Sequence, residues 1–126
     1  MLAHYEAIAN LAVKDLETAR GFYEDTLGLQ QVGAEGDEVL VFQAGASQLF
    51  VYRSEFAGTN QATALSWVVG DAIDEEVRAL AAKGVRFEHY PDMPGMHLEG
   101  DLHVAEGMKV AWFKDPDGNI LSLVTG

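Results

Sequence analysis

The sequence contains no cysteine among its 126 residues. This absence excludes a disulfide, a thiol nucleophile and a thiolate metal site. No apolar run approaches the roughly 20 residues that a membrane-spanning helix needs, so we expect no membrane contact. The first residues do not combine a basic stretch with an apolar one, so we expect no signal peptide and a cytoplasmic location.

Basic side chains are also scarce. Eight Lys and Arg stand against twenty Asp and Glu, which gives a formal net charge of −12. A charge of this sign repels phosphate backbones, so we expect no nucleic-acid partner. The acidity otherwise favours solubility. The length and the hydrophobic share of 48% predict one globular domain with a core of its own.

The clearest local signal is the tetrapeptide Asp115-Pro116-Asp117-Gly118, which separates two apolar runs. Pro116 sets φ for a tight turn, the Asp115 carboxylate can accept backbone N–H groups, and Gly118 tolerates a positive φ. The pattern predicts a β-hairpin over residues 108–124. A hairpin cannot bury both faces by itself, so earlier segments must cover it.

A helix signal occurs twice at a fixed distance. Asp15 is suited to cap a helix that Gly28 ends. Asp71 and Gly84 repeat this pair 56 residues later. One strand before each helix and three after it make two β-α-β-β-β modules, with strands expected at 5–13, 29–34, 38–44, 48–53, 64–69, 85–90, 108–114 and 119–124. Module one spans about residues 5–53, a linker about 54–63 and module two about 64–126.

Module two carries an additional segment, residues 91–107, between its second and third strands. Segments this long are usually functional or disordered. Met93 and Met96 help to make it too apolar for a solvated coil, so we interpret it as a flap, with ligand contact or dimer packing as its role. The chain's histidines in this region lack a recognised metal-ligand spacing, and solvated loops are expected. A new metal site is the alternative, made by His89, His97 and His103 with Asp92, Glu99 or Asp101.

These features together resemble the vicinal oxygen chelate superfamily, which includes glyoxalase I, bleomycin-resistance proteins, fosfomycin-resistance enzymes and extradiol dioxygenases. The resemblance covers nearly the whole chain. It implies an α+β fold in which two βαβββ modules form an incomplete mixed-sheet barrel, with the ligand in its cavity and a homodimer as the assembly. The residues that carry it are Val13-Lys14-Asp15-Leu16, Phe22-Tyr23 before Leu27-Gly28-Leu29, and the run from Phe113 to Asn119.

The resemblance also implies four metal-ligand positions, which relatives fill with His or Glu. Here they hold Ile8, Phe50, Ala64 and Ser122, with Tyr52 in place of Phe50 if the register differs by two. Hydrocarbon side chains offer no lone pair, and a single serine hydroxyl is a weak ligand. We therefore expect no metal and no other cofactor.

Strand alternation predicts which side chains share the cavity face. They are apolar with a few neutral hydrogen-bonding groups, as in small-molecule pockets, and core packing without a ligand is the alternative reading for each. Trp112 is included because the equivalent residue faces the ligand in fosfomycin-type relatives. The predicted ligand-binding residues are Ile8, Asn10, Phe50, Tyr52, Ala64, Ser66, His97, Trp112 and Ser122. The residues expected to face the helices are Leu11, Val13, Leu49, Val51, Leu65, Trp67, Leu121 and Leu123.

The sequence thus predicts metal-independent binding of a small, largely apolar organic molecule in the barrel cavity. Sequestration of a drug or natural product, as in bleomycin-resistance proteins, is one form of this function. The alternative is a glyoxalase-like lyase or isomerase that uses a relocated metal or acid-base work by His97, Tyr52 or Ser122; no catalytic residue is assigned. A third hypothesis is an interaction protein whose dimer surface matters more than any cavity.

Overall fold

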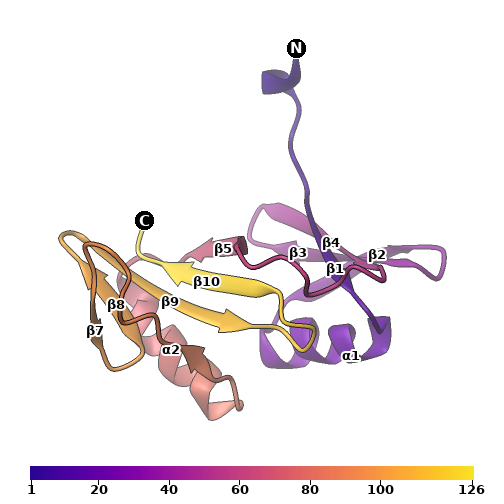
Figure 1. Cartoon of the computed structure of the whole chain (residues 1–126). Helices are drawn as coiled ribbons and strands as arrows, with labels where there is room; N and C mark the ends of the chain where they lie inside the picture. The colour runs from indigo at the N-terminus through magenta and orange to yellow at the C-terminus, as the bar shows by residue number, and fades with distance from the viewer. The chain divides into compact units, whose positions relative to one another are not determined.

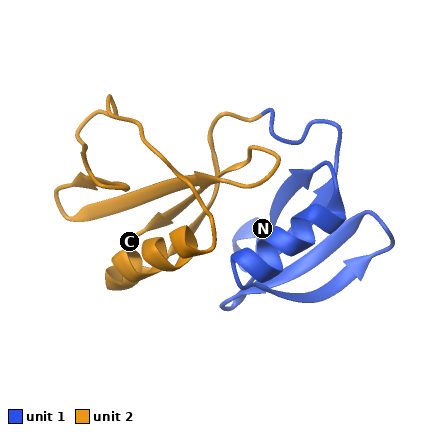
Figure 2. Ribbon diagram, turned by 90° about the horizontal axis from the view of Figure 1, so that it is seen from below, with its two compact units in different colours: residues 1–59 blue, residues 60–126 orange.

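The computed structural model describes all 126 residues as two compact units, Met1–Thr59 and Asn60–Gly126 (Figure 2). Each unit combines one open mixed sheet with one main helix (Figure 1). The predicted α+β class is therefore confirmed, and neither sheet closes into a barrel. Unit 1 has the predicted β-α-β-β-β order, whereas unit 2 has five strands after its helix where three were expected. No helix is long and apolar enough to cross a membrane.

Unit 1 contains the strands β1 (Ala9–Val13), β2 (Gln30–Glu35), β3 (Val39–Ala44) and β4 (Ser47–Arg53). Their order in the sheet is β1-β4-β3-β2. β1 runs parallel to β4, and the other neighbours are antiparallel. A parallel pair needs a crossover, and the helix between β1 and β2 together with β2 and β3 supplies it.

The first eight residues do not join this sheet. We expected the first strand to begin at residue 5, but it begins at Ala9, and Leu2–His4 form a 3₁₀-helical turn. Residues 1–8 project away from the rest of unit 1 (Figure 1), and the side chain of Tyr5 is exposed. A strand needs a hydrogen-bonded neighbour, and β4 pairs with β1 only from Ala9 onward.

The first helix confirms both of its predicted ends. Asp15 caps α1 (Leu16–Arg20): its carboxylate accepts the Thr18 hydroxyl at 2.7 Å and the Glu17 N–H at 3.2 Å. These bonds, that of Thr18 foremost, lower the pKa of Asp15. The helix continues in wider, π-helical turns over Gly21–Thr26, and Gly28 leaves it at a φ of 77°. Its apolar side joins the unit 1 core, which includes Leu11, Val13, Ala19, Tyr23, Leu40, Phe42, Leu49 and Val51.

Unit 2 contains the strands β5 (Thr63–Val68), β6 (Phe87–Glu88), β7 (His97–Glu99), β8 (Leu102–Ala105), β9 (Met108–Lys114) and β10 (Ile120–Val124). The sheet order is β5-β10-β9-β8-β7, and β6 also pairs with β9. β5 and β10 are parallel, and the other pairs are antiparallel.

The interpretation of residues 91–107 as a flap is wrong for its second half. β6 is only two residues long, although a strand over 85–90 was expected, and it covers only one end of β9. β8 pairs with the other end of β9, and β7 then pairs with β8. The unpaired backbone groups of β9 supply the physical reason, because they must find hydrogen-bond partners. The inserted segment therefore extends the sheet.

The second helix confirms its predicted end but not its predicted start. Asp71 lies within a 3₁₀ turn (Gly70–Ala72), and α2 (Ile73–Ala82) has Ala72 at its N-cap with no side-chain capping bond. Three acidic residues in the first turn, Asp74 to Glu76, instead place negative charge near the positive end of the helix dipole. The N–H of Gly84 bonds to the carbonyl of Ala81, and its φ is 94°.

The core of unit 2 differs from the expectation on one strand. Leu65 and Trp67 are half-buried, although we expected them in the core. The reason is that β5 is an edge strand with no neighbour on its outer side; the Trp67 ring does stack on Phe113, with centroids 6.3 Å apart. The buried apolar residues of this unit are Ile73, Val77, Leu80, Leu102, Val110, Ala111, Phe113, Leu121 and Leu123.

The terminal hairpin forms as its turn residues predict. Oδ1 of Asp115 accepts the N–H groups of Asp117 at 3.0 Å and Asn119 at 2.8 Å. Oδ2 accepts the Asn119 side-chain amide at 2.8 Å. Gly118 has a φ of 93° and donates its N–H to the Asp115 carbonyl. The loop is thus closed by one buried carboxylate.

Candidate functional site

The predicted site residues of unit 1 lie on or beside β1 and β4. Asn10 pairs with Phe50, and Tyr52 pairs with Ala12. Phe50 and Tyr52 are half-buried, whereas the alternating residues of β4 are fully buried against the helix side. These residues therefore share the face of the sheet that is turned away from α1, which we name the helix-free face. Ile8 lies just before β1 and is 40% exposed.

The predicted residues of unit 2 come together on three neighbouring strands. Ser66 of β5 pairs with Ser122 of β10, which in turn pairs with Trp112 of β9. The hydroxyl oxygens of Ser66 and Ser122 are 2.6 Å apart, and Ser122 is buried. The indole N–H of Trp112 donates to the Thr63 hydroxyl at 3.0 Å. This group forms the helix-free face of the second sheet, with Ala64 exposed beside it.

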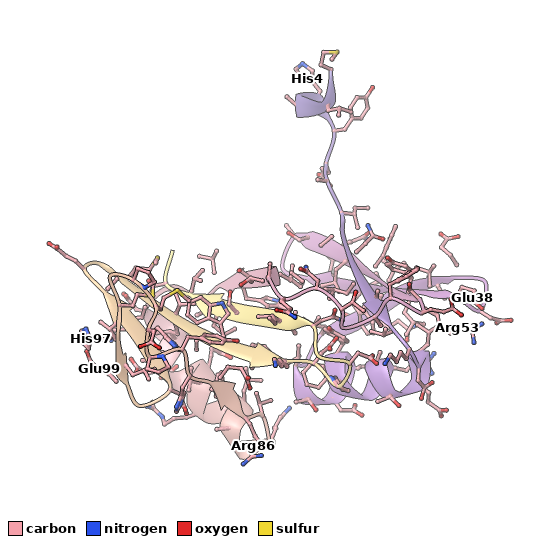
Figure 3. All side chains as sticks on the ribbon, in the orientation of Figure 1. His4, Glu38, Arg53, Arg86, His97 and Glu99 are labelled. Carbon is pink, nitrogen blue, oxygen red and sulfur yellow. The ribbon has the colours of Figure 1, made fainter.

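His97 stands apart from this group. It begins β7, and β8 lies between β7 and β9. Its Nε2 is 2.7 Å from a carboxylate oxygen of Glu99, and both side chains are exposed (Figure 3). The structure therefore brings Trp112, Ser66 and Ser122 together but does not bring His97 to them.

His103 was not predicted as a site residue, and its expected place in a solvated loop is wrong. It lies in β8 opposite Val110, on the same face as Trp112, and is 1% exposed. Its ring is perpendicular to the Trp112 indole with centroids 4.8 Å apart, and 5.7 Å from the Tyr90 ring. The signal was available: residues 102–105 precede the turn pair Glu106-Gly107 and so form a second hairpin with 108–114.

The hydrogen bonds and burial of His103 determine the protonation state and the tautomer of its ring. Nε2 accepts the backbone N–H of Tyr90 at 2.9 Å, whereas Nδ1 makes no hydrogen bond. Burial lowers the pKa of His103, and the backbone carbonyl of Val110 offsets this only in part. The imidazole is therefore neutral at neutral pH, with its proton on Nδ1.

The four positions that relatives use for metal do not fit a metal ion here. Ile8, Phe50 and Ala64 have no donor atoms, and the Ser122 hydroxyl is already hydrogen-bonded to Ser66. Divalent ions need three or four nitrogen or oxygen ligands. The structure contains no group of three or more His, Asp or Glu that could hold one elsewhere.

Unit 1 also has an open hollow of about 470 Å³ between the N-terminal arm and the β3–β4 turn. Its lining is mainly polar and includes the side chains of Gln43 and Gln48, which are 3.4 Å apart between Nε2 and Oε1. Of the predicted residues, it contains only Ile8. The hollow therefore does not contain the aromatic side chains of the predicted site.

Comparison with known proteins gives a family and a fold. The profile of the Glyoxalase/Bleomycin resistance protein/Dioxygenase superfamily matches residues 2–123. No curated protein sequence matches the chain significantly.

Solved structures with this fold include three at low sequence identity. An integron cassette protein from the mobile metagenome of the Halifax Harbour sewage outfall is 17% identical, with a TM-score of 0.70 over 97% of this chain and 100% of that one. Fosfomycin resistance protein FosX from Mesorhizobium loti is 15% identical, with a TM-score of 0.68 over 97% and 92%. Lactoylglutathione lyase from Agrobacterium tumefaciens is 20% identical, with a TM-score of 0.65 over 95% and 93%. Likeness at these identities concerns the fold alone. On the profile match, the chain belongs to the Glyoxalase/Bleomycin resistance protein/Dioxygenase superfamily.

Proposed function

We propose that this protein binds a small, largely apolar organic molecule without a metal ion, and that Trp112 is the central contact. The observation that carries the proposal is the position of Trp112. Its half-buried indole lies on the helix-free face of the second sheet, and its N–H is bonded to Thr63. That bond fixes the indole plane, so its exposed surface is a pre-ordered apolar contact for a ligand.

Neutral polar groups beside Trp112 support a binding role. The Ser66 and Ser122 hydroxyls form one hydrogen-bonded pair, and each hydroxyl has donor or acceptor capacity beyond that bond. An apolar surface with sparse neutral polar groups is the usual make-up of a small-molecule site. Binding without a metal is supported by Ile8, Phe50 and Ala64, whose hydrocarbon side chains contain no atom that can coordinate an ion.

The first sheet supplies a second aromatic surface. Phe50 and Tyr52 are half-buried on the helix-free face of unit 1. Uncovered apolar surface of this kind favours covering by a ligand or by another copy of the chain. We propose that the protein acts as a homodimer in the cytoplasm and sequesters a drug or natural product; the description of its superfamily includes a bleomycin resistance protein.

Tryptophan fluorescence tests this proposal. The Trp67→Phe variant retains Trp112 as its single tryptophan. We expect saturable quenching by some planar aromatic compounds in a panel, at one site per chain. The matched Trp112→Phe variant retains Trp67 and should show no saturable response. Absence of saturable quenching across the panel contradicts the proposal.

Native mass spectrometry of the purified protein tests the remaining parts. We expect a dimer and no stoichiometric divalent metal. A bound divalent metal at one per chain would contradict metal independence and favour the alternative function, a glyoxalase-like lyase or isomerase. A monomer at micromolar concentration would contradict the homodimer.

A further inference from the structure

Among the buried side chains, only one nitrogen or oxygen atom lacks a hydrogen-bond partner: Nδ1 of His103. Buried polar groups in folded proteins are almost always paired, so an exception needs an explanation. His103 is 1% exposed, and no role in the binding function proposed above uses it.

The hydrogen bond at Nε2 determines whether Nδ1 of His103 is a donor or an acceptor. Nε2 accepts the Tyr90 N–H at 2.9 Å and therefore holds a lone pair. The proton of the neutral ring must then be on Nδ1, which makes Nδ1 a hydrogen-bond donor. The Val110 backbone acts on the ring as a weak hydrogen-bond partner that raises the pKa of His103, but Nδ1 makes no hydrogen bond of ordinary distance and angle. His103 thus offers one N–H without an acceptor.

This donor belongs to a ring cluster that includes the proposed ligand contact. The rings of Tyr90, His103 and Trp112 contact one another pairwise, with centroids 4.8 to 5.7 Å apart. Tyr90 begins a segment of two successive turns, in which the N–H of Met93 bonds to the Tyr90 carbonyl and that of Met96 to the Met93 carbonyl. Met93 and Met96 are half-buried and have flexible side chains. Nδ1 of His103 is closed to solvent in this structure, so a ligand reaches it only if this segment moves.

We propose that His103 selects the ligand: its Nδ1–H donates a hydrogen bond to the carbonyl oxygen of a planar aromatic compound whose ring contacts Trp112. This inference rests on the proposed binding function. It adds the chemical class, an uncharged aromatic carbonyl compound, and the residue that recognises it.

Charge argues for an uncharged acceptor. A neutral imidazole offers a donor but no positive charge, so a buried carboxylate or phosphate at this place would lack a counter-ion. The net charge of −12 further repels anions. A cation offers no lone pair to Nδ1. An uncharged carbonyl oxygen accepts the hydrogen bond from Nδ1 and needs no counter-ion.

Two probes of nearly equal shape test the assignment. 2-Acetylnaphthalene has a carbonyl oxygen, and 2-isopropylnaphthalene has a methyl group in its place. The dissociation constant of each is measured by Trp112 quenching in the Trp67→Phe background. In that protein we expect a preference for the ketone, and we expect His103→Phe to reduce the preference about fivefold, the value of one net hydrogen bond.

Matched variants separate the donor from the ring. His103→Phe keeps an aromatic ring in the cluster and removes the donor. His103→Asn places an amide N–H near the position of Nδ1 and should restore part of the preference. His89→Phe makes the same substitution at an exposed histidine, whose Nε2 is 2.8 Å from Asp101, and should leave the preference unchanged.

A measurement on the protein without substitution at His103 covers the case in which the variants do not fold. With ¹⁵N-labelled histidine, saturation with the ketone should shift the Nδ1–H resonance of His103, and the hydrocarbon should not. If both probes bind and neither the preference nor this resonance depends on His103, the assignment of His103 is wrong while the binding function stands. If neither probe quenches Trp112 while other compounds of the panel do, the assignment of His103 is wrong and the binding function stands; if no compound of the panel quenches Trp112, both proposals are wrong.

Discussion

Replacing Asp115 by alanine should destabilise unit 2 more than any other single change in a turn. The Asp115 side chain is 4% exposed and accepts three hydrogen bonds within the terminal hairpin. Two of the donors belong to Asn119, which is 7% exposed. The third is the backbone N–H of Asp117, in a half-buried residue that water can reach after the substitution.

The magnitude follows from the two Asn119 donors. A buried donor that loses its partner costs about 1–3 kcal/mol, so Asp115→Ala should lower the free energy of unfolding by about 4 kcal/mol. Asp115→Asn keeps one oxygen for the backbone donors but turns an amide toward the Asn119 amide. It should therefore lose one buried bond and cost about 2 kcal/mol.

Urea unfolding followed by tryptophan fluorescence measures these changes, because Trp67 and Trp112 both lie in unit 2. Glu106→Ala, a change of an exposed carboxylate in the β8–β9 turn, is the control and should alter stability by less than about 0.5 kcal/mol. The reasoning is refuted if Asp115→Ala costs less than about 1 kcal/mol, or if the asparagine variant is as unstable as the alanine variant.

Two further predictions concern stability. Burial lowers the folded-state pKa of His103 below its ordinary value of 6.5, so the unfolded chain binds more protons and stability should decline as pH falls below about 6.5. His103→Gln keeps an acceptor near Nε2 and should flatten this part of a plot of melting temperature against pH; an unchanged slope would exclude His103 as its source. Gly118 has a φ of 93°, so Gly118→Ala should cost about 1–3 kcal/mol in urea unfolding, and a neutral result would show that the turn relaxes without strain.

The parts of the fold that depend on neighbouring residues could be predicted from the sequence. The turn at Asp115 and Gly118, and the helix start at Asp15, follow from side chains that bond to backbone within four residues. Asp71 shows the limit of this reasoning. Its residue type suits a cap, but the chain forms a 3₁₀ turn there, and the helix begins one residue later than a cap at Asp71 requires.

The parts that depend on distant pairing could not be predicted in the same way. The alternation of β4 correctly separated buried Leu49 and Val51 from half-buried Phe50 and Tyr52. The burial of His103, however, arises from its pairing with β9 and from rings that come from other segments. The turn pair Glu106-Gly107 is a local signal for the pairing of β8 with β9, but no local pattern shows which rings meet His103. The sequence therefore identified Trp112 and Ser122 as candidates and missed the histidine beside Trp112.

The most direct test of the proposed function is a titration of the Trp67→Phe protein with 2-acetylnaphthalene, before and after removal of metal by dialysis against EDTA. The dissociation constant obtained from Trp112 quenching is the quantity measured. We predict saturable binding at one site per chain, with a dissociation constant that changes less than twofold on metal removal and on addition of Zn²⁺ or Mn²⁺. Binding that disappears with EDTA and returns with either ion would contradict a metal-independent site centred on Trp112.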